Sequence, residues 1–143
     1  MSETTQIHPG KVRAYLATDY RLGNTSQDIV LNIGKRSERL AALFAASGVD
    51  CGAFLTAYNP RSTIQPPAEN ERGHAELAGK LQELKLQAIE GSGREEGTKW
   101  PAEKSYFALG LALEPAKAIG IHFDQDAIVW VGPDAVPQLI LLR

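Results

Sequence analysis

The sequence predicts an α+β fold, in which three to four helices pack on a mixed β-sheet of about five to six strands. Two observations carry this prediction. Short apolar or alternating segments, typical of strands, are interspersed along the chain with segments of helical spacing. The chain has 143 residues, of which 43% are hydrophobic and 22% charged, the size and composition of one globular domain. We therefore expect a single domain over residues 1–143.

The first half of the chain is expected to contain two helices and two strands. Residues 1–8 are polar and predicted to be loose. Pro9 is well placed to open a short helix, since proline is tolerated at the first helical position. Gly48 is suited to end the second helix. In chain order, the expected elements are a helix from Pro9, a strand at 28–33, a helix at 36–47 and a strand at 53–58.

The second half is expected to add two helices and four strands. A glycine-rich, charged stretch at 91–101, GSGREEGTKWP, is interpreted as a connecting loop. The last two strands are expected to form a hairpin across the turn GPDA. In chain order, the expected elements are a helix at 68–83, strands at 84–90 and 105–112, a helix from Glu114 to near Phe123, and strands at 127–132 and 137–143.

The connections between these strands predict where a site would lie. Strands joined through a helix usually run in the same sense, whereas strands joined by a short loop run in opposite senses. The strand at 53–58 should therefore end at the sheet edge where the strands at 105–112 and 127–132 begin. Polar residues are concentrated at these positions, and loops at strand ends commonly carry ligand sites.

We expect the resulting cluster to bind a small polar or anionic molecule. Arg61 would anchor a carboxylate or phosphate, and amide side chains would orient the ligand. Asn70 falls on the inward face of its helix, seven residues before Leu77. The predicted ligand-binding residues are Asn59, Arg61, Ser62, Asn70, Trp100 and Gln125.

Two alternative functions remain open from the residues. In the first, the chain is an enzyme in which Glu103, packed under Trp100, acts as a general acid or base. In the second, the apolar C-terminal strand PQLILLR pairs with a partner or with a second copy, which would make a homo-oligomer. A purely structural network among the polar residues is the competing explanation for the cluster.

Composition argues against several other classes. The formal net charge is −2 and the basic residues are scattered, which disfavours a nucleic-acid-binding protein. A single cysteine, Cys51, and three dispersed histidines predict no disulfide and no metal site. No apolar run is long enough to span a bilayer, so we expect a cytoplasmic protein with no membrane partner. No cofactor is predicted.

Several strings together resemble a known family in order and spacing. They are AYLATDY (14–20), AFLTAYNPRS (53–62), Asn70, WPAEKS (100–105) and HFDQDAIVWVG (122–132). This pattern is similar to that of the bacterial domain-of-unknown-function family 3293. Where that family has Phe-Gly-Gln-Asn-Ala, this chain has Phe123-Asp124-Gln125-Asp126-Ala127, a departure at two positions. The resemblance implies a small bacterial protein, marks the predicted site residues and Glu103 as motif positions, and implies no substrate.

Overall fold

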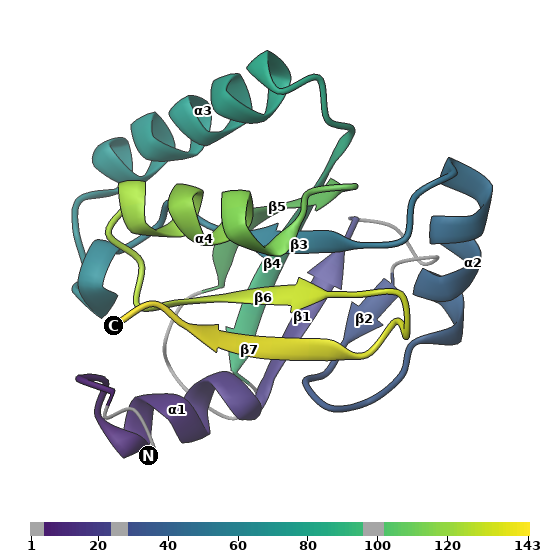
Figure 1. Ribbon diagram of the computed structural model, residues 1–143. Coiled ribbons are helices and arrows are strands. Elements are labelled where there is room, and N and C mark those ends of the chain that lie inside the picture. The colour runs from purple at the N-terminus through teal and green to yellow at the C-terminus, as the bar shows by residue number, and fades with distance from the viewer. Residues whose placement is uncertain (1–4, 24–28, 96–101) are drawn as a thin grey trace.

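One antiparallel sheet organises the chain. In the computed structural model, which describes residues 5–23, 29–95 and 102–143, seven strands pair in the order β2-β1-β4-β5-β3-β6-β7 (Figure 1). The strands are β1 (Thr18–Leu22), β2 (Ile29–Leu31), β3 (Gly52–Leu55), β4 (Ala88–Glu95), β5 (Glu103–Leu109), β6 (Ala127–Val131) and β7 (Pro137–Leu141). The α-helices are α1 (Pro9–Leu16), α2 (Glu38–Ser47), α3 (Pro67–Glu83) and α4 (Leu113–His122), and Pro60–Ser62 forms a 3-10 turn.

The α+β class is confirmed, and the seven strands of the described residues are close to the five to six expected. The expected mixed sheet is wrong, because every neighbouring pair of strands is antiparallel. Strands joined through a helix do run in the same sense, as predicted. They are not neighbours, however, because an antiparallel strand lies between them: β5 separates β3 from β4, and β3 separates β5 from β6.

Two segments account for the remaining differences. Thr18–Leu22 was not predicted as a strand, although its side chains alternate between buried and less buried positions. The strand expected at 84–90 lies at Ala88–Glu95, so the stretch GSGRE is strand rather than loop. Residue 28, the first of the expected strand at 28–33, lies outside the described residues.

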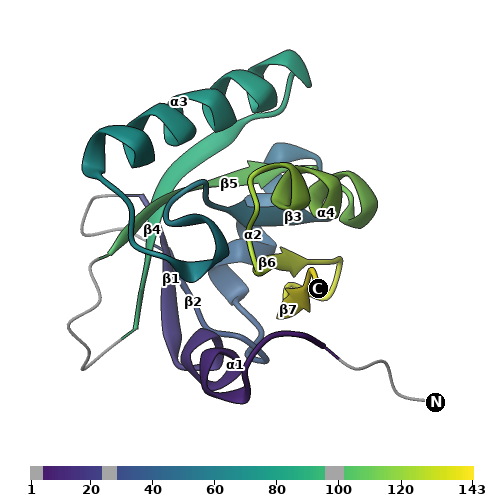
Figure 2. The same ribbon diagram turned by 90° about the vertical axis from the view of Figure 1, so that its left-hand side faces the viewer.

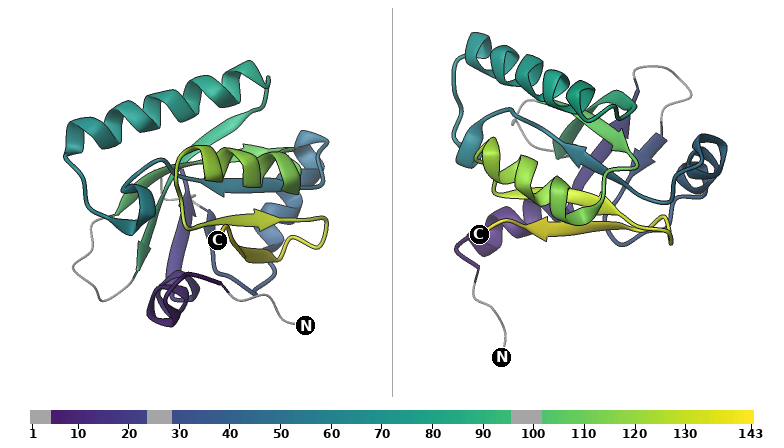
Figure 3. Two further views of the ribbon diagram at one scale, coloured as in Figure 1. Left: turned by 60° about the vertical axis from the view of Figure 1, so that its left-hand side comes forward. Right: turned by 45° about the horizontal axis from the view of Figure 1, so that its top comes forward.

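The two faces of the sheet pack against different helices. Residues at alternate positions of β3, β5 and β6 point to opposite faces, as the pleat requires. Helices α3 and α4 lie together on one face (Figures 1 and 3), and Leu77 and Leu81 of α3 pack there with Ala53, Leu55 and Ala108. The other face curls around α2, whose Leu40 and Phe44 join a second cluster with Tyr20, Leu22, Phe54, Phe107 and Val129.

The curled sheet is bridged at the α2 end. The backbone N–H of Gly34 donates to Pro137 O at 2.9 Å, and the N–H of Ser37 donates to Ala135 O at 2.9 Å. These bonds tie the segment after β2 to the start of β7, so the two edge strands are connected there. The Ser37 hydroxyl then accepts from the N–H of Leu40 and caps α2.

At the opposite end, α1 and residues 5–8 lie beside the concave face of the sheet (Figure 2). Residues 5–8, part of the segment predicted to be loose, make contacts with the rest of the fold. Ile7 is buried, and the Thr5 hydroxyl donates to the backbone oxygen of Arg143. The N-terminal segment therefore packs beside the end of β7. This end of the sheet is where the predicted polar residues gather.

Candidate functional site

A cavity of about 250 Å³ opens on the concave face between α1 and the sheet. Its floor is largely apolar and comes from alternate positions of the strands, with Phe54 of β3, Val129 of β6 and Leu139 of β7 among its members. Its rim is polar. The polar and charged lining residues are Lys11, Tyr15, Thr18, Tyr20, Thr56, Asn59, Ser62, Glu95, Glu103, Ser105 and Gln125.

Glycines in β4 leave room for this cavity. Gly91 pairs with Ser105 and Gly93 with Glu103, on the face of the sheet that also carries Phe107. A Cβ atom at Gly93 would meet only ordinary contacts, the nearest being 3.6 Å away on Tyr20, so a larger side chain there would extend into the cavity. The GSG sequence therefore shapes the site, which the interpretation of this stretch as a loop did not foresee.

Asn59 and Asn70 form the buried centre of the polar network. The N–H of Asn59 donates to Asn70 Oδ1 at 2.9 Å, and Asn70 Nδ2 donates to Asn59 Oδ1 at 3.1 Å. Asn59 Nδ2 also donates to Glu103 Oε2 at 2.8 Å, which orients that carboxylate at the cavity wall. Gln65 contributes two further bonds, from its backbone N–H to Asn59 Oδ1 and from its side chain to Asn70 Oδ1.

The turn after Asn59 has an unusual backbone. Asn59, Arg61 and Ser62 have φ values of 45°, 56° and 57°, in the left-handed region that non-glycine residues seldom adopt. A second turn faces it, in which Asp124 has φ 54°. The Arg61 N–H donates to Asp124 O at 2.7 Å, so the two turns hold each other. Residues keep such backbone conformations only where contacts with the surrounding structure enforce them, and these positions are often near functional sites.

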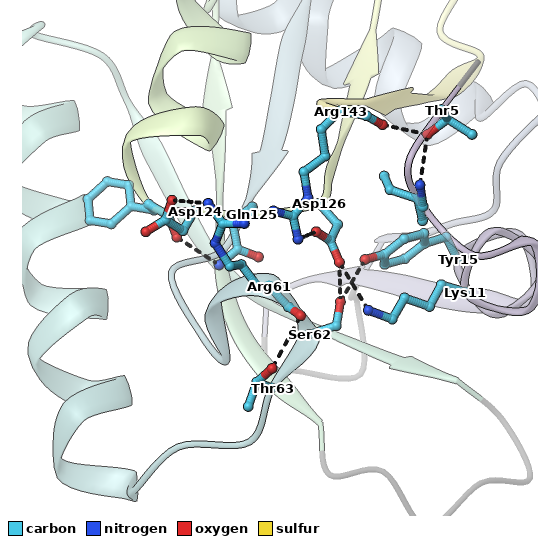
Figure 4. A network of polar contacts seen from close by, with 12 residues as sticks. Thr5, Lys11, Tyr15, Arg61, Ser62, Thr63, Asp124, Gln125, Asp126 and Arg143 are labelled. Atoms are coloured by element: carbon cyan, nitrogen blue, oxygen red, sulfur yellow. Dashed lines mark hydrogen bonds and ion pairs between the residues drawn. The ribbon is translucent and has the colours of Figure 1, made fainter.

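The Arg61 side chain does not line the cavity. Its guanidinium lies 3.6 Å from the Asp124 carboxylate, and both side chains are more than half exposed (Figure 4). An exposed pair of this kind contributes little to stability. The backbone of Arg61 thus lies close to the predicted cluster, but its side chain is not part of the cavity lining.

Gln125 and Ser62 occupy the rim on the α4–β6 side. Gln125 Nε2 donates to the backbone oxygens of Tyr58 at 3.1 Å and Phe123 at 3.4 Å, bonds that connect the two turns again. The Ser62 hydroxyl donates to Asp126 Oδ2 at 2.7 Å and lies 3.2 Å from the Tyr15 hydroxyl (Figure 4). Trp100, the remaining predicted ligand-binding residue, lies outside the described residues.

Asp126 is an important residue that sequence reasoning did not select. Its side chain is 1% exposed, and its carboxylate pairs with Lys11 Nζ at 3.4 Å and with the Arg143 guanidinium. Burial alone would raise the pKa of Asp126, but the Ser62 hydroxyl and the Arg143 and Lys11 charges outweigh it and hold that pKa below its usual value. The carboxylate therefore links three parts of the chain: α1 through Lys11, the 3-10 turn through Ser62, and the residues after β7 through Arg143. The one feature of the sequence that could have indicated Asp126 is the departure from the family pattern at this position.

Replacing Asp126 with asparagine is expected to lower the free energy of unfolding at pH 7 by about 1–2 kcal/mol. The loss stays moderate because Lys11 and Arg143 are partly exposed and can regain water. The pKa of Asp126 is depressed in the folded protein, so its contribution is complete above the unfolded pKa and is lost as pH falls through the folded one.

Urea unfolding of wild type and Asp126→Asn between pH 3 and 7 measures this. The difference in unfolding free energy between the two proteins should be constant above about pH 5 and shrink below about pH 4. Asp50→Asn, a change at an exposed residue, is the control and should alter stability by less than about 0.5 kcal/mol. A difference that grows toward acid pH would contradict the assignment.

Among the described residues, the cavity wall contains two carboxylates and one ammonium group, those of Glu95, Glu103 and Lys11. The ammonium faces the buried Asp126 carboxylate. Burial raises the pKa values of the Tyr15 and Tyr20 hydroxyls, so both remain protonated donors at neutral pH. Neither tyrosine was among the site residues predicted from the sequence. They contact the cavity because α1 and the unpredicted strand β1 close its side.

The described residues contain neither a metal-binding cluster nor a membrane-spanning helix. Within 5–23, 29–95 and 102–143, no three His, Cys, Asp or Glu side chains are grouped so as to hold a metal ion. None of the helices in these ranges combines the length and apolarity that crossing a bilayer requires.

Comparison with known proteins identifies a family for the region that contains the polar network. No curated protein and no solved structure gives a significant match. The model of the family described as "Protein of unknown function (DUF3293)" matches residues 55–128, just over half of the chain. The match includes Asn59, Asn70, Glu103, Gln125 and Asp126, and it excludes α1 and β1, which complete the cavity. The chain belongs to this family of proteins of unknown function.

Proposed function

We propose that the protein binds a small polar molecule with an apolar body in the cavity between α1 and the sheet. The observation that carries this proposal is a cavity of about 250 Å³ with an apolar floor and a rim of side chains already fixed by hydrogen bonds. A mostly apolar cavity with a few oriented polar groups is the usual form of a small-molecule site. A cavity of 150 Å³ holds benzene, so this one has room for about ten non-hydrogen atoms.

The lining favours a polar ligand over an anionic one. The anionic prediction depended on Arg61, whose guanidinium pairs with Asp124 outside the cavity lining. Among the described residues that line the cavity, Lys11 is the one cation, and its ammonium is engaged with the Asp126 carboxylate. Arg61 is therefore not expected to be the anchor.

A thermal-shift screen of amino acids, amines, alcohols and sugar phosphates tests the proposal. A ligand at a hundred times its Kd stabilises the folded protein by about 2.7 kcal/mol, which raises Tm by several degrees. Gly93→Leu should abolish the shift by filling the cavity, and Leu139→Phe should weaken it. Gly79→Leu adds the same bulk in open space on α3 and should preserve the shift. Arg61→Ala should also preserve it.

Two results would contradict the proposal. One is that no compound of suitable size stabilises the wild-type protein. The other is that the same compounds stabilise wild type and Gly93→Leu equally, which would locate binding elsewhere. Loss of the shift in Arg61→Ala alone would restore the anionic prediction.

The enzyme alternative has one supporting observation, the position of Glu103. This carboxylate lines the cavity and is oriented by Asn59, as a general acid or base would need to be. Turnover of a bound compound that is lost in Glu103→Gln, with binding retained, would favour it. The alternative of an interaction module through β7 remains a prediction.

A further inference from the structure

We infer that helix α1 is a hinged cover of the cavity, which is attached to β1 at one end and is held closed at the other by contacts with Ser62, Asp126 and Arg143. The inference rests on the proposed function, since it concerns how a ligand enters that same cavity. Three observations support it: the place of α1 in the fold, its lack of buried residues, and the different nature of its two attachments.

Helix α1 lies at a side of the cavity that strand pairing leaves open. Among the described strands, β2 and β7 are the two edges of the sheet and do not pair with each other, and the backbone bonds that bridge them lie at the α2 end. At the cavity end, α1 lies between β1 and β7 (Figure 2), and it contributes Lys11, Ala14 and Tyr15 to the lining. A movement of α1 would therefore open the cavity without breaking any strand pair.

Apolar packing holds α1 only weakly. None of its eight residues is buried, and Leu16 is 50% exposed. The other α-helices of the described residues bury two or three residues each. Elements with few buried apolar contacts are the ones that open locally at a low cost in free energy. Of the elements that line the cavity, α1 is therefore the one best suited to move.

The attachment of α1 to β1 is local in the sequence. Ala17 alone separates the helix from the strand. The Thr18 hydroxyl donates to Ala14 O at 2.7 Å, and the Tyr20 hydroxyl donates to Tyr15 O at 2.8 Å. These bonds join residues only four or five positions apart, so they keep the C-terminal end of α1 beside β1. We therefore place the hinge at Ala17.

The attachments on the other side join residues far apart in the sequence. Lys11 Nζ lies 3.4 Å from Asp126 Oδ2, which also accepts a hydrogen bond from the Ser62 hydroxyl at 2.7 Å. The Tyr15 hydroxyl lies 3.2 Å from Ser62 Oγ (Figure 4). The Arg143 guanidinium pairs with the same buried carboxylate. Helix α1 is thus fastened to a fixed group of side chains from the 3-10 turn and the end of the chain.

The segment before α1 is attached at the same place. The Thr5 hydroxyl donates to the backbone oxygen of Arg143, and Ile7 is buried. We call the latch the contacts of Lys11 with Asp126, of Tyr15 with Ser62 and of Thr5 with Arg143. Breaking these few contacts, together with the burial of Ile7, would allow α1 to turn about Ala17 while the sheet stays intact.

Reaction of a cavity thiol with the bulky disulfide 5,5′-dithiobis(2-nitrobenzoate) measures this opening. The test protein has Cys51→Ser, which removes the native thiol, and Gly93→Cys, which places a thiol in the cavity. The reference has Cys51→Ser and Gly79→Cys, because a side chain at Gly79 extends into open space on α3. We expect the cavity thiol to react about a hundredfold more slowly than the reference thiol, since α1 has to open first.

Weakening the latch should accelerate the reaction of the cavity thiol. Asp126→Asn removes the charge that Lys11 contacts, and we expect an acceleration of about tenfold, the value of one charged hydrogen bond. Tyr15→Phe removes only the contact with the Ser62 hydroxyl and should accelerate the reaction about threefold. It also serves as the second variant if Asp126→Asn does not fold.

Ile119→Val is the control for a general loss of stability. Ile119 is buried in the cluster beneath α3 and α4, on the face of the sheet away from α1, and its truncation destabilises the protein moderately. It should leave the rate of the cavity thiol within about twofold, because local opening of α1 does not involve this cluster.

Two results would overturn the inference. A cavity thiol that reacts as fast as the Gly79→Cys thiol would show that α1 does not cover it. Latch variants that react no faster than Ile119→Val would show that α1 does not open at the latch. The test uses no ligand, so either result leaves the proposed function to be decided by the thermal-shift screen. If α1 opens as expected and the screen yields no ligand, the proposed function is wrong and the cover is confirmed.

Discussion

Gly91→Ala is expected to destabilise the protein by about 3 kcal/mol or more, since overpacking against a rigid neighbour costs this much. A Cβ atom at this position would lie 2.1 Å from the backbone oxygen of Arg21 in β1. That atom belongs to a paired strand and cannot turn aside as the end of a side chain would. We therefore expect β1 and β4 to separate locally, with a large loss in urea-unfolding midpoint.

Gly93→Ala is the matched control for this prediction. Gly93 lies two residues further along the same strand and faces the same side of the sheet. Its added methyl group would meet no atom closer than 3.6 Å, so the change in unfolding free energy should be below about 1 kcal/mol. Equal effects of the two substitutions would show that the contact between β1 and β4 differs from the one described.

Asn70→Ala is expected to cost about 3 kcal/mol, because it leaves the buried N–H of Asn59 and the Asn59 side-chain oxygen without this partner. Unfolding in urea, followed by fluorescence and by circular dichroism, measures the loss. The same substitution should free the turn that carries Ser62, which would reduce any ligand binding in the cavity as well.

Gln65→Ala is the control, since Gln65 also bonds to Asn70 Oδ1 but is only partly buried. Its loss should cost about 1 kcal/mol or less. If Asn70→Ala is as mild as Gln65→Ala, then the asparagine pair is not the centre of the network.

The sequence was sufficient to predict which polar residues of the candidate site lie together, but not the complete strand order of the sheet. The end of the strand expected at 53–58 and the beginnings of those expected at 105–112 and 127–132 were predicted to meet at one sheet edge. Three polar residues from these connections, Asn59, Glu103 and Gln125, do line one cavity. The prediction of the shared edge succeeded because the type of connection between two strands sets their relative sense, even when the two strands are not neighbours in the sheet. The predicted burial of Asn70 is likewise confirmed.

The missed parts have physical reasons. Gly91 and Gly93 have the composition of a loop, but in this protein they allow a close approach between strands and leave the cavity open. Strand β1 is short and contains charged residues, so its alternation was a weak signal. Arg61 was expected to face the ligand, but its guanidinium pairs with Asp124 and is not part of the cavity lining. The positive φ values of its turn are not revealed by residue spacing.

A map of amide chemical-shift changes in 15N-labelled protein shows most directly whether the cavity holds a ligand, when the titrant is a compound that stabilises the wild-type protein in the thermal-shift screen. We expect the largest changes on residues around the cavity, namely Tyr20, Gly93, Ser105 and Val129, and we expect these changes to disappear in Gly93→Leu. Changes centred on α3 or on β2, or changes of equal size in the variant, would show that the concave face is not where this protein holds a ligand.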